Sequence, residues 1–362
     1  MRIDRLPLTY DECRARFRRA AAVAGLHLTP HAIAARGRDG QQLSIDVVQF
    51  GSSVPRRALI LQSGVHGVEG FIGSTVQTDL LARLDPAALP SDMAVLVIHA
   101  VNPWGMSWWR RQNESNVDLN RNWQRDSGDP IHNDAYDELH PFACPDTPTL
   151  PSVDELLVQA MTMVAERGMT WVKDGITRGQ YRHPDGLHFG GDRTEESCRI
   201  LEQLVPDRLS SAEQVLTIDL HTGHGPHGEV TFLSDQPPGS AQDDYLRAHF
   251  PGFRIEATAD NPDATTGVKS GQIANGYAAV LPGASCVASS VEFGTAPDTE
   301  QLAATYLESW VHRHGDAMNP EHAAVTWNYR CCFTPDDPEW ETISVVDGRK
   351  LVDQAIAAVV AG

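Results

Sequence analysis

Ala58-Leu-Ile-Leu-Gln62, which leads through Ser63 into Gly64-Val-His-Gly-Val-Glu-Gly70, is the stretch that decides the fold. A short, continuous apolar run that breaks at a glycine predicts a buried strand. Residues 71–84 then carry apolar side chains at helical spacing, and residues 93–101 form a second apolar run. Strands that alternate with helices predict an α/β fold, with a mixed, mostly parallel sheet covered by helices on both faces.

The N-terminal part, residues 1–56, is predicted to be a helix followed by a β-hairpin. Thr9 and Glu12 form a capping box, so a helix should run from there to about Ala24. Asp39-Gly40 lies between two segments of alternating hydrophobicity and is a hairpin signal. The helix contains a run of positive charge, which we interpret as a solvated face, at Arg14, Arg16, Arg18 and Arg19.

The remaining segments complete a single domain over residues 1–362. Two apolar runs predict further strands, at 214–220 and 284–293. Apolar periodicity predicts helices at 153–166, 194–204, 299–314 and 347–361. Residues 124–192 are rich in Asp, Pro, Gly and His and contain only the first of these helices. We interpret residues 124–192 as a long decoration of the sheet rather than as a second domain.

Composition argues against two classes of partner. The 362-residue chain carries 48 Asp and Glu against 29 Lys and Arg, a formal net charge of −19, without a basic stripe that would attract nucleic acid. No stretch approaches the roughly 18 consecutive apolar residues of a membrane-spanning helix. The first residues show no apolar signal segment, and the six cysteines include no Cys-x-x-Cys pair. We therefore expect free thiols and a cytoplasmic location.

Four chemically capable side chains fall at the ends of predicted strands. His66 and Glu69 follow the strand predicted at residues 58–62, His221 follows the one at 214–220, and Glu292 lies at the end of the one at 284–293. Ligands of open α/β sheets bind beyond the carboxyl ends of the strands, so these side chains are expected to meet there. Two imidazoles and one carboxylate with an open fourth position make a catalytic zinc site. Structural zinc would need a closed shell, usually with thiolates, and we see no cysteine placed for it.

The most specific pattern follows the strand predicted at residues 93–101. It consists of Asn102-Pro-Trp-Gly105, Trp109-Arg-Arg-Gln-Asn113 and Asn116-Val-Asp-Leu-Asn-Arg-Asn-Trp123. Together with the earlier His-x-x-Glu, the later His and the strand-end Glu, this order of motifs resembles the M14 family of zinc carboxypeptidases, and more narrowly its bacterial DUF2817 branch. The resemblance spans residues 57–295 and implies a single zinc-carboxypeptidase-like domain.

Carried over residue by residue, the resemblance implies a metal centre. His66, Glu69 and His221 would bind one Zn2+ per chain. Asp118 would orient His66 from outside the ligand set. Two further histidines follow the third ligand closely, and the strand-end position favours His221 over His224 and His227.

The resemblance also implies catalytic and substrate-binding residues. Glu292 would be the general base, and Arg110 would polarise the scissile carbonyl and stabilise the oxyanion. Arg111 is a rival for that role, because the register of the Trp-Arg-Arg run is open. The resemblance implies two other substrate contacts. One is a clamp for the substrate carboxylate, with Asn120 and Arg121 as candidates, and the other is a tyrosine on a mobile loop, with Tyr277 as the candidate.

These residues predict a zinc-dependent hydrolase that cleaves an amide bond near a free carboxylate, as a carboxypeptidase does. One alternative is an amidohydrolase that deacylates small N-acyl amino acids, similar to aspartoacylase and succinylglutamate desuccinylase. Another is a zinc-binding protein without activity, against which the presence of Glu292 and all three ligands argues. The expected partner is a peptide or small molecule with a carboxylate, and the oligomeric state stays open.

Overall fold

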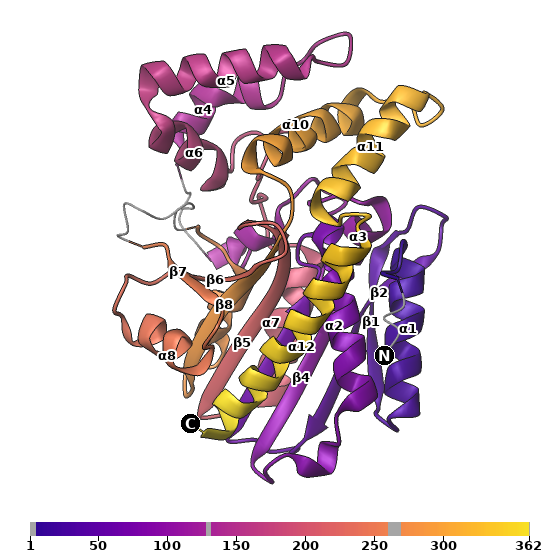
Figure 1. Ribbon diagram of the computed structural model, residues 1–362, viewed down its shortest axis with the longest axis vertical. Coiled ribbons are helices and arrows are strands. Elements are labelled where there is room, and N and C mark those ends of the chain that lie inside the picture. The colour runs from indigo at the N-terminus through magenta and orange to yellow at the C-terminus, as the bar shows by residue number, and fades with distance from the viewer. Residues whose placement is uncertain (1–4, 128–131, 260–268, 362) are drawn as a thin grey trace.

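An eight-stranded sheet forms the centre of the protein (Figure 1). The computed structural model describes residues 5–127, 132–259 and 269–361. The strands are β1 (Leu28–Arg36), β2 (Gln42–Gly51), β3 (Arg57–Ser63), β4 (Met93–His99), β5 (Gln214–Gly223), β6 (Val230–Ser234), β7 (Arg254–Ala257) and β8 (Ser285–Gly294). Their order across the sheet is β1-β2-β4-β3-β5-β8-β6-β7. The four central strands, β4, β3, β5 and β8, are parallel, and antiparallel pairs flank them, which confirms the predicted mixed sheet.

Twelve α-helices and four short 3-10 helices lie within the described residues. The α-helices are α1 (Tyr10–Val23), α2 (Gly70–Arg83), α3 (Pro103–Trp108), α4 (Asp134–Ala143), α5 (Val153–Arg167), α6 (Met169–Thr177), α7 (Glu196–Leu209), α8 (Ala241–His249), α9 (Ile273–Val280), α10 (Asp298–His314), α11 (Pro320–Phe333) and α12 (Pro338–Ala361). The 3-10 helices are η1 (Gly67–Glu69), η2 (Pro86–Ala88), η3 (Leu119–Arg121) and η4 (Arg125–Ser127).

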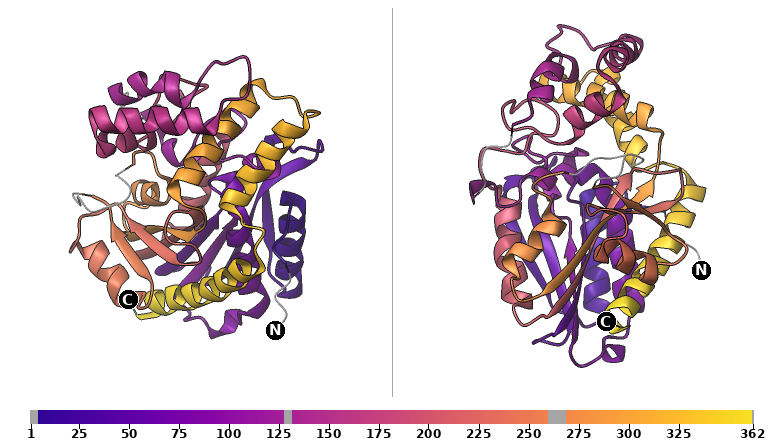
Figure 2. Two further views of the ribbon diagram at one scale, coloured as in Figure 1. Left: turned by 45° about the horizontal axis from the view of Figure 1, so that its top comes forward. Right: turned by 90° about the vertical axis from the view of Figure 1, so that its left-hand side faces the viewer.

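Helices cover both faces of the sheet, as predicted. α1, α2, α8 and α12 lie on one face, whereas α7 and α9 lie on the other (Figures 1 and 2). On β3, Leu59 and Leu61 belong to the apolar core between the sheet and α1, α2, α8 and α12, while Ala58 and Ile60 belong to the core between the sheet and α7 and α9. This alternation follows from the two-residue period of a strand, and it explains why the sequence of β3 is continuously apolar.

Strand register brings the chemically capable residues to one edge of the sheet. In the parallel pair β5–β8, His221 lies opposite Glu292. In the parallel pair β3–β5, Ser63 at the end of β3 lies opposite Leu220. The turn that carries His66 therefore begins next to His221, at the carboxyl ends of the central strands.

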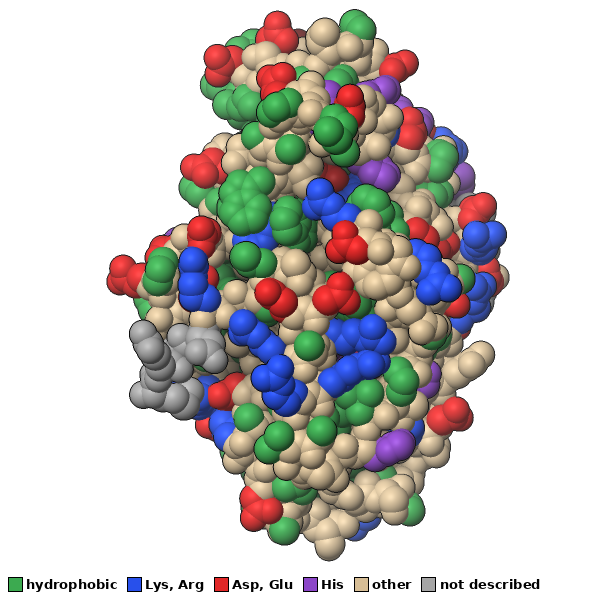
Figure 3. All heavy atoms as spheres, turned by 90° about the vertical axis from the view of Figure 1, so that its right-hand side faces the viewer, with side chains coloured by type: hydrophobic (Ala, Val, Ile, Leu, Met, Phe, Trp, Pro, Cys, Tyr) green, Lys and Arg blue, Asp and Glu red, His purple; other side chains and the backbone are tan. Residues whose placement is uncertain are grey.

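The N-terminal helix and hairpin form as predicted, but the basic run does not simply face solvent. Thr9 caps α1 by accepting a hydrogen bond from the Glu12 N–H at 3.2 Å. Arg18 forms an ion pair with the buried Asp46 of β2 at 2.6 Å, and Arg14 donates to the Gln42 carbonyl at 3.1 Å. Figure 3 shows this side of the molecule, where Lys and Arg side chains gather. Part of the charge run thus holds α1 against the hairpin.

The described part of the decoration, residues 124–127 and 132–192, contains three α-helices where one was predicted. α5 matches the prediction, whereas α4 and α6 were missed. Pro141 lies inside α4 and Gly175 inside α6, and both residue types weaken the sequence signal of a helix. The three helices pack over α10 beyond the strand ends (Figure 2), where Leu139 and Ile176 join Tyr306 of α10 in one apolar cluster.

Within the described ranges, no helix combines the length and the apolar character needed to cross a membrane.

Candidate metal centre

A glycine-rich turn after β3 positions the first two candidate ligands. Gly64 has a φ of +70°, a left-handed conformation that favours glycine. A Cβ atom on Gly67 would lie 2.0 Å from the carbonyl carbon of Gly105, so the turn packs against α3 only because this side chain is absent. The close approach buries both His66 and Glu69 at the end of β3.

His66, Glu69 and His221 meet at the strand ends. Nδ1 of His66 lies 3.0 Å from the Glu69 carboxylate, and Nδ1 of His221 lies 2.9 Å from it. All three residues are buried, with exposures of 5%, 2% and 1%. One ligand atom from each lies within 4.8 Å of the others, so the group is able to hold a metal ion. The structure thus brings together the three side chains that the sequence analysis selected.

The electrostatics of this group favour a bound positive charge. Burial alone would raise the pKa of Glu69, but the rings of His66 and His221 and the Arg111 guanidinium hold it well below its usual range. Burial would also lower the pKa of His221, yet the carboxylates of Asp219 and Glu69 raise it well above its ordinary value. The ionised Glu69 carboxylate therefore attracts either a proton on the imidazoles or a cation between them.

Two further carboxylates face the imidazoles from behind. Asp118 Oδ1 lies 3.1 Å from Nε2 of His66, and Asp219 Oδ2 lies 2.8 Å from Nε2 of His221. Asp118 caps η3 and accepts the Asn120 N–H at 3.0 Å, which fixes its orientation. The sequence predicts a role for Asp118 but not for Asp219, although Asp219 precedes His221 by two residues in β5. That spacing places both side chains on one face of the strand.

Of the two neighbouring arginines, Arg111 is the one beside the cluster. Its Nη1 donates to Glu69 at 3.0 Å, and its Nε donates to Asp118 at 3.1 Å. Arg110 is directed instead toward α10, where its Nε donates to Glu308 at 2.7 Å. The structure therefore places Arg111, which the sequence leaves open as an alternative, at the position expected for Arg110.

Asn120 and Arg121 lie in η3, directly after Asp118. The side chain of Asn120 accepts the Ile273 N–H at 3.0 Å. Arg121 is 1% exposed, and its Nη1 and Nη2 donate to the carbonyls of Asn120 and Thr177 at 2.8 and 2.7 Å. Its Nε is buried without a hydrogen-bond partner among the described residues. One donor of the predicted carboxylate clamp thus stays uncommitted.

Glu292 lies beside the cluster, and the alternative histidines point elsewhere. Glu292 is half-buried, opposite His221 in the sheet, and accepts the His224 N–H at 3.4 Å. Nε2 of His224 lies 3.3 Å from Glu256, and His227 contacts a main-chain carbonyl beyond β8. Of the three histidines, only His221 contributes to the His66–Glu69 cluster.

The sequence matches, over residues 7–347, the family described as "Protein of unknown function (DUF2817)". The chain belongs to the DUF2817 family. No curated protein matches it. Among solved structures, this DUF2817 chain is similar to carboxypeptidase A from Helicoverpa armigera, with 12% identity, a TM-score of 0.45, and coverage of 90% of this chain and 74% of that one.

Two further solved structures are similar to this DUF2817 protein. One is the succinylglutamate desuccinylase from Chromobacterium violaceum, with 14% identity, a TM-score of 0.40, and coverage of 89% of this chain and 74% of that one. The other is the succinylglutamate desuccinylase/aspartoacylase from Rhodobacter sphaeroides, with 15% identity, a TM-score of 0.38, and coverage of 81% and 67%.

Tyr277 of the DUF2817 protein lies in the core rather than beside the cluster. Its side chain is 0% exposed, and its hydroxyl donates to Gln62 Oε1 at 2.5 Å. Its ring meets the ring of Trp123 edge-on, with 5.2 Å between centroids. This packing fastens α9 to the sheet, which is a different position from that of a tyrosine on a mobile loop.

The decoration contributes a residue that the sequence analysis did not assign to the site. Nδ1 of His188 lies 3.2 Å from Asp118 Oδ2, on the same carboxylate that contacts His66 and Arg111. Burial lowers the pKa of His188 to about 4, against the opposing effect of Asp118, so this imidazole is neutral near pH 7. Its sequence position, 70 residues after Asp118, gave no signal of this contact.

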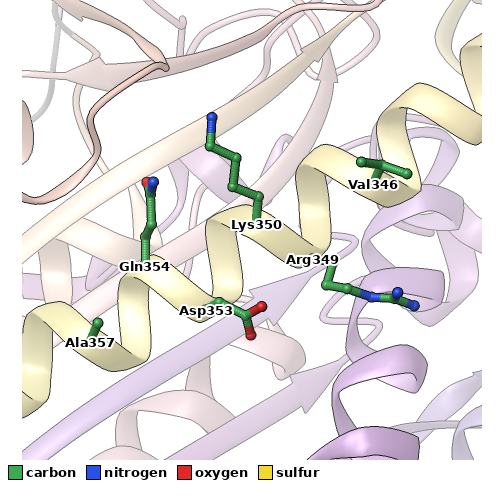
Figure 4. A pocket seen from close by; sticks show the side chains of 6 residues that line it. All are labelled: Val346, Arg349, Lys350, Asp353, Gln354 and Ala357. Atoms are coloured by element: carbon green, nitrogen blue, oxygen red, sulfur yellow. The ribbon is translucent and has the colours of Figure 1, made fainter.

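Two surface hollows of the DUF2817 protein lie apart from the candidate ligands. One, of about 430 Å³, runs along α12 (Figure 4) and is lined by Val346, Arg349, Lys350, Asp353, Gln354 and Ala357. The other, of about 570 Å³, is lined by residues that include His227, Thr295 and Cys332. Neither hollow is lined by His66, Glu69 or His221, and all three of these residues are buried at the strand ends.

Proposed function

We propose that this DUF2817 protein is a zinc-dependent hydrolase that cleaves an amide bond near a free carboxylate. The observation that carries the proposal is the buried cluster of His66, Glu69 and His221, which joins two imidazoles and a carboxylate within 4.8 Å. Buried groups of this kind need a compensating charge, and they are uncommon where they serve packing alone. Their place at the carboxyl ends of parallel strands is where α/β proteins bind ligands.

The cluster fits Zn2+ in its donors and in its surroundings. Zinc in catalytic sites takes three protein ligands of this type and keeps a fourth position open. Each imidazole has its second nitrogen beside a carboxylate, Asp118 or Asp219, which fixes the ring and increases its basicity as a ligand. Bound there, zinc would supply a Lewis acid that activates water and polarises the scissile carbonyl.

Glu292 is the proposed general base. Its half-buried carboxylate lies opposite His221 in the sheet, at the edge where the substrate bond would lie. It accepts a proton from the attacking water and passes that proton to the leaving amine.

Arg111 is the proposed donor to the oxyanion, in preference to Arg110. A guanidinium has five N–H donors, and the bonds from Arg111 to Glu69 and Asp118 use its Nε and Nη1. The remaining donors are held beside the cluster, where an oriented positive charge stabilises the developing negative charge. Arg110 directs its Nε to Glu308 of α10 instead.

Arg121 with Asn120 is the proposed clamp for the substrate carboxylate. The uncommitted Nε of Arg121 supports this role, because a buried donor without a partner is costly unless a ligand satisfies it. Lys269 lies near Arg121, and burial together with this neighbouring guanidinium lowers the pKa of the Lys269 ammonium. Together these groups would counter the net charge of −19 that otherwise repels an anionic substrate.

The test is a hydrolysis screen of the zinc-loaded protein. C-terminally free peptides and N-acyl amino acids are assayed side by side, with and without a chelator. Turnover that the chelator abolishes and zinc restores supports the proposal. Activity on the peptides identifies a carboxypeptidase, and activity on the acylated amino acids identifies a deacylase.

Two glutamate variants sharpen this test. Glu292→Gln should retain bound zinc and lose turnover, because it removes the base without touching the ligands. Glu341→Gln is the matched control, since Glu341 is also shielded but accepts the Leu6 N–H and is not one of the cluster's residues. A protein that binds no zinc, or a Glu292→Gln variant as active as the parent, would overturn the assignment.

A further inference from the structure

A second group of metal-binding side chains lies in the decoration. His140 and Cys144 stand one helical turn apart, at the end of α4, and Asp185 lies in the loop after α6. One ligand atom from each lies within 4.8 Å of the others. Cys144 is buried, His140 is half-buried and Asp185 is exposed, so the group is open to solvent on one side.

Local contacts already hold these side chains against one another. His140 Nε2 lies 3.9 Å from Asp185 Oδ1, and the Cys144 thiol contacts the Asp185 carbonyl at 3.2 Å. The ring of His140 stacks on that of His183, with 3.9 Å between centroids. Nδ1 of His140 is buried and lacks a hydrogen-bond partner among the described residues. An unpartnered buried nitrogen of this kind is costly, and a bound ligand would satisfy the ring.

We propose that His140, Cys144 and Asp185 bind a second Zn2+, in addition to the ion proposed at the strand ends. A thiolate, an imidazole and a carboxylate are all ligands of zinc, whereas calcium and magnesium prefer oxygen ligands alone. Solvent at the exposed side of Asp185 completes the four positions. The sequence alone does not predict this group, because Cys144 and Asp185 are 41 residues apart.

The ion would clamp the loop that reaches from the decoration to the first centre. The Asn116 side chain donates to the carbonyls of Pro184 and Gly186, on either side of Asp185. Three residues beyond Asp185, His188 contacts Asp118. A metal bridge from Asp185 to α4 would therefore fix the loop that places His188, and its role would be structural rather than catalytic.

Cobalt substitution tests the second site separately from the first. A thiolate bound to Co2+ gives a charge-transfer band in the near ultraviolet, and the cluster of His66, Glu69 and His221 contains no sulfur. The protein stripped of metal and reloaded with Co2+ should show this band and bind two equivalents. Cys144→Ser should lose the band and one equivalent. His66→Ala should also lose one equivalent but keep the band, even if the proposed hydrolase activity is never found.

Two controls keep the result interpretable. Cys286→Ser removes a partly buried thiol outside the group, so it should keep the band and both equivalents. Asp185→Asn changes an exposed side chain. It should release its Co2+ at chelator concentrations that leave the parent protein loaded. The proposal is overturned if the parent shows no thiolate band, if Cys144→Ser leaves the band unchanged, or if Asp185→Asn holds its Co2+ against the chelator as the parent does.

Discussion

Replacing Asp118 by asparagine tests how the candidate centre is held. One oxygen of Asp118 contacts Nε2 of His66 at 3.1 Å, and the other accepts Nε of Arg111 at 3.1 Å and faces Nδ1 of His188 at 3.2 Å. The substitution keeps the size of the side chain but removes its charge. His66 would then be a weaker donor to the metal, and Arg111 would lose half of its anchoring.

The size of the effect follows from these contacts. Removing a carboxylate that supports a ligating histidine typically lowers metal affinity about 10- to 100-fold, or about 1.4–2.7 kcal/mol. We expect Asp118→Asn near the upper end, because the same carboxylate also fixes Arg111, which in turn holds Glu69 at 3.0 Å. The fold should weaken as well, by about 3–5 kcal/mol, since Asp118 is buried and the mostly shielded Arg111 guanidinium is left partly unpaired.

Affinity and stability are measured separately. Zinc affinity is obtained by competition with a chromophoric chelator, in a Cys144→Ser background so that only the strand-end site is titrated. Denaturant unfolding of the metal-free protein gives the stability. Asp46→Asn is the matched control, because Asp46 is equally buried and pairs with Arg18 of α1 rather than with a residue of the centre. It should destabilise the fold and leave zinc affinity unchanged. The supporting role of Asp118 is refuted if Asp118→Asn binds zinc as the parent does, or if Asp46→Asn weakens zinc binding equally.

Three further changes have defined outcomes. Arg111→Gln should lower turnover about 10²–10³-fold, whereas Arg110→Gln should chiefly destabilise the protein by about 3–5 kcal/mol, and steady-state kinetics with denaturant unfolding separates the two. Gly67→Ala should cost at least about 1–3 kcal/mol, because its Cβ meets backbone at 2.0 Å, while Gly283→Ala, which meets nothing within 4 Å, should be near neutral in the same measurement. Burial lowers the pKa of His99 to about 4, so the unfolded chain takes up a proton on this imidazole before the folded chain does as the pH falls. About 3 kcal/mol of stability that is present above pH ~6.5 should therefore be lost by pH ~4. Denaturant unfolding at a series of pH values should show a smaller loss for His99→Gln.

The sheet and the candidate metal cluster could be predicted because both depend on local patterns. The apolar run of β3 forms a strand buried on both faces, and parallel strands bring their carboxyl ends to one edge. His66, Glu69 and His221 follow directly from that rule. Asp219 was also within reach, because the two-residue period of β5 places it beside His221.

Other elements left little local signal. β6 and β7 have five and four residues, too few for a clear alternation. α12 begins at Pro338, well before the predicted residue 347, because its first turns carry mixed rather than periodic side chains. The contact of His188 with Asp118 depends on how the decoration folds back over the sheet, and no local pattern in the loop sequence predicts that path.

The choice between Arg110 and Arg111 shows how one backbone angle can override a motif. α3 ends at Trp108, and its C-cap residue, Trp109, has a φ of +57°, a conformation that costs a bulky residue about 1–2 kcal/mol. The contacts that offset this cost come from elsewhere in the chain: the Trp109 ring nitrogen donates to the Leu8 carbonyl at 3.2 Å, and the ring packs edge-on against Trp327.

The left-handed residue sets the direction of the chain that follows it. The Arg110 carbonyl then accepts the Val68 N–H at 2.9 Å, on the turn that carries the ligands. With its backbone fixed there, the Arg110 side chain leaves toward Glu308 and the next side chain, Arg111, enters the cluster. A tryptophan gives no sequence signal for a left-handed turn, so motif order alone selects Arg110 while the geometry selects Arg111. The comparison of the two glutamine variants decides between them, and loss of turnover in a stably folded Arg110→Gln would favour the motif.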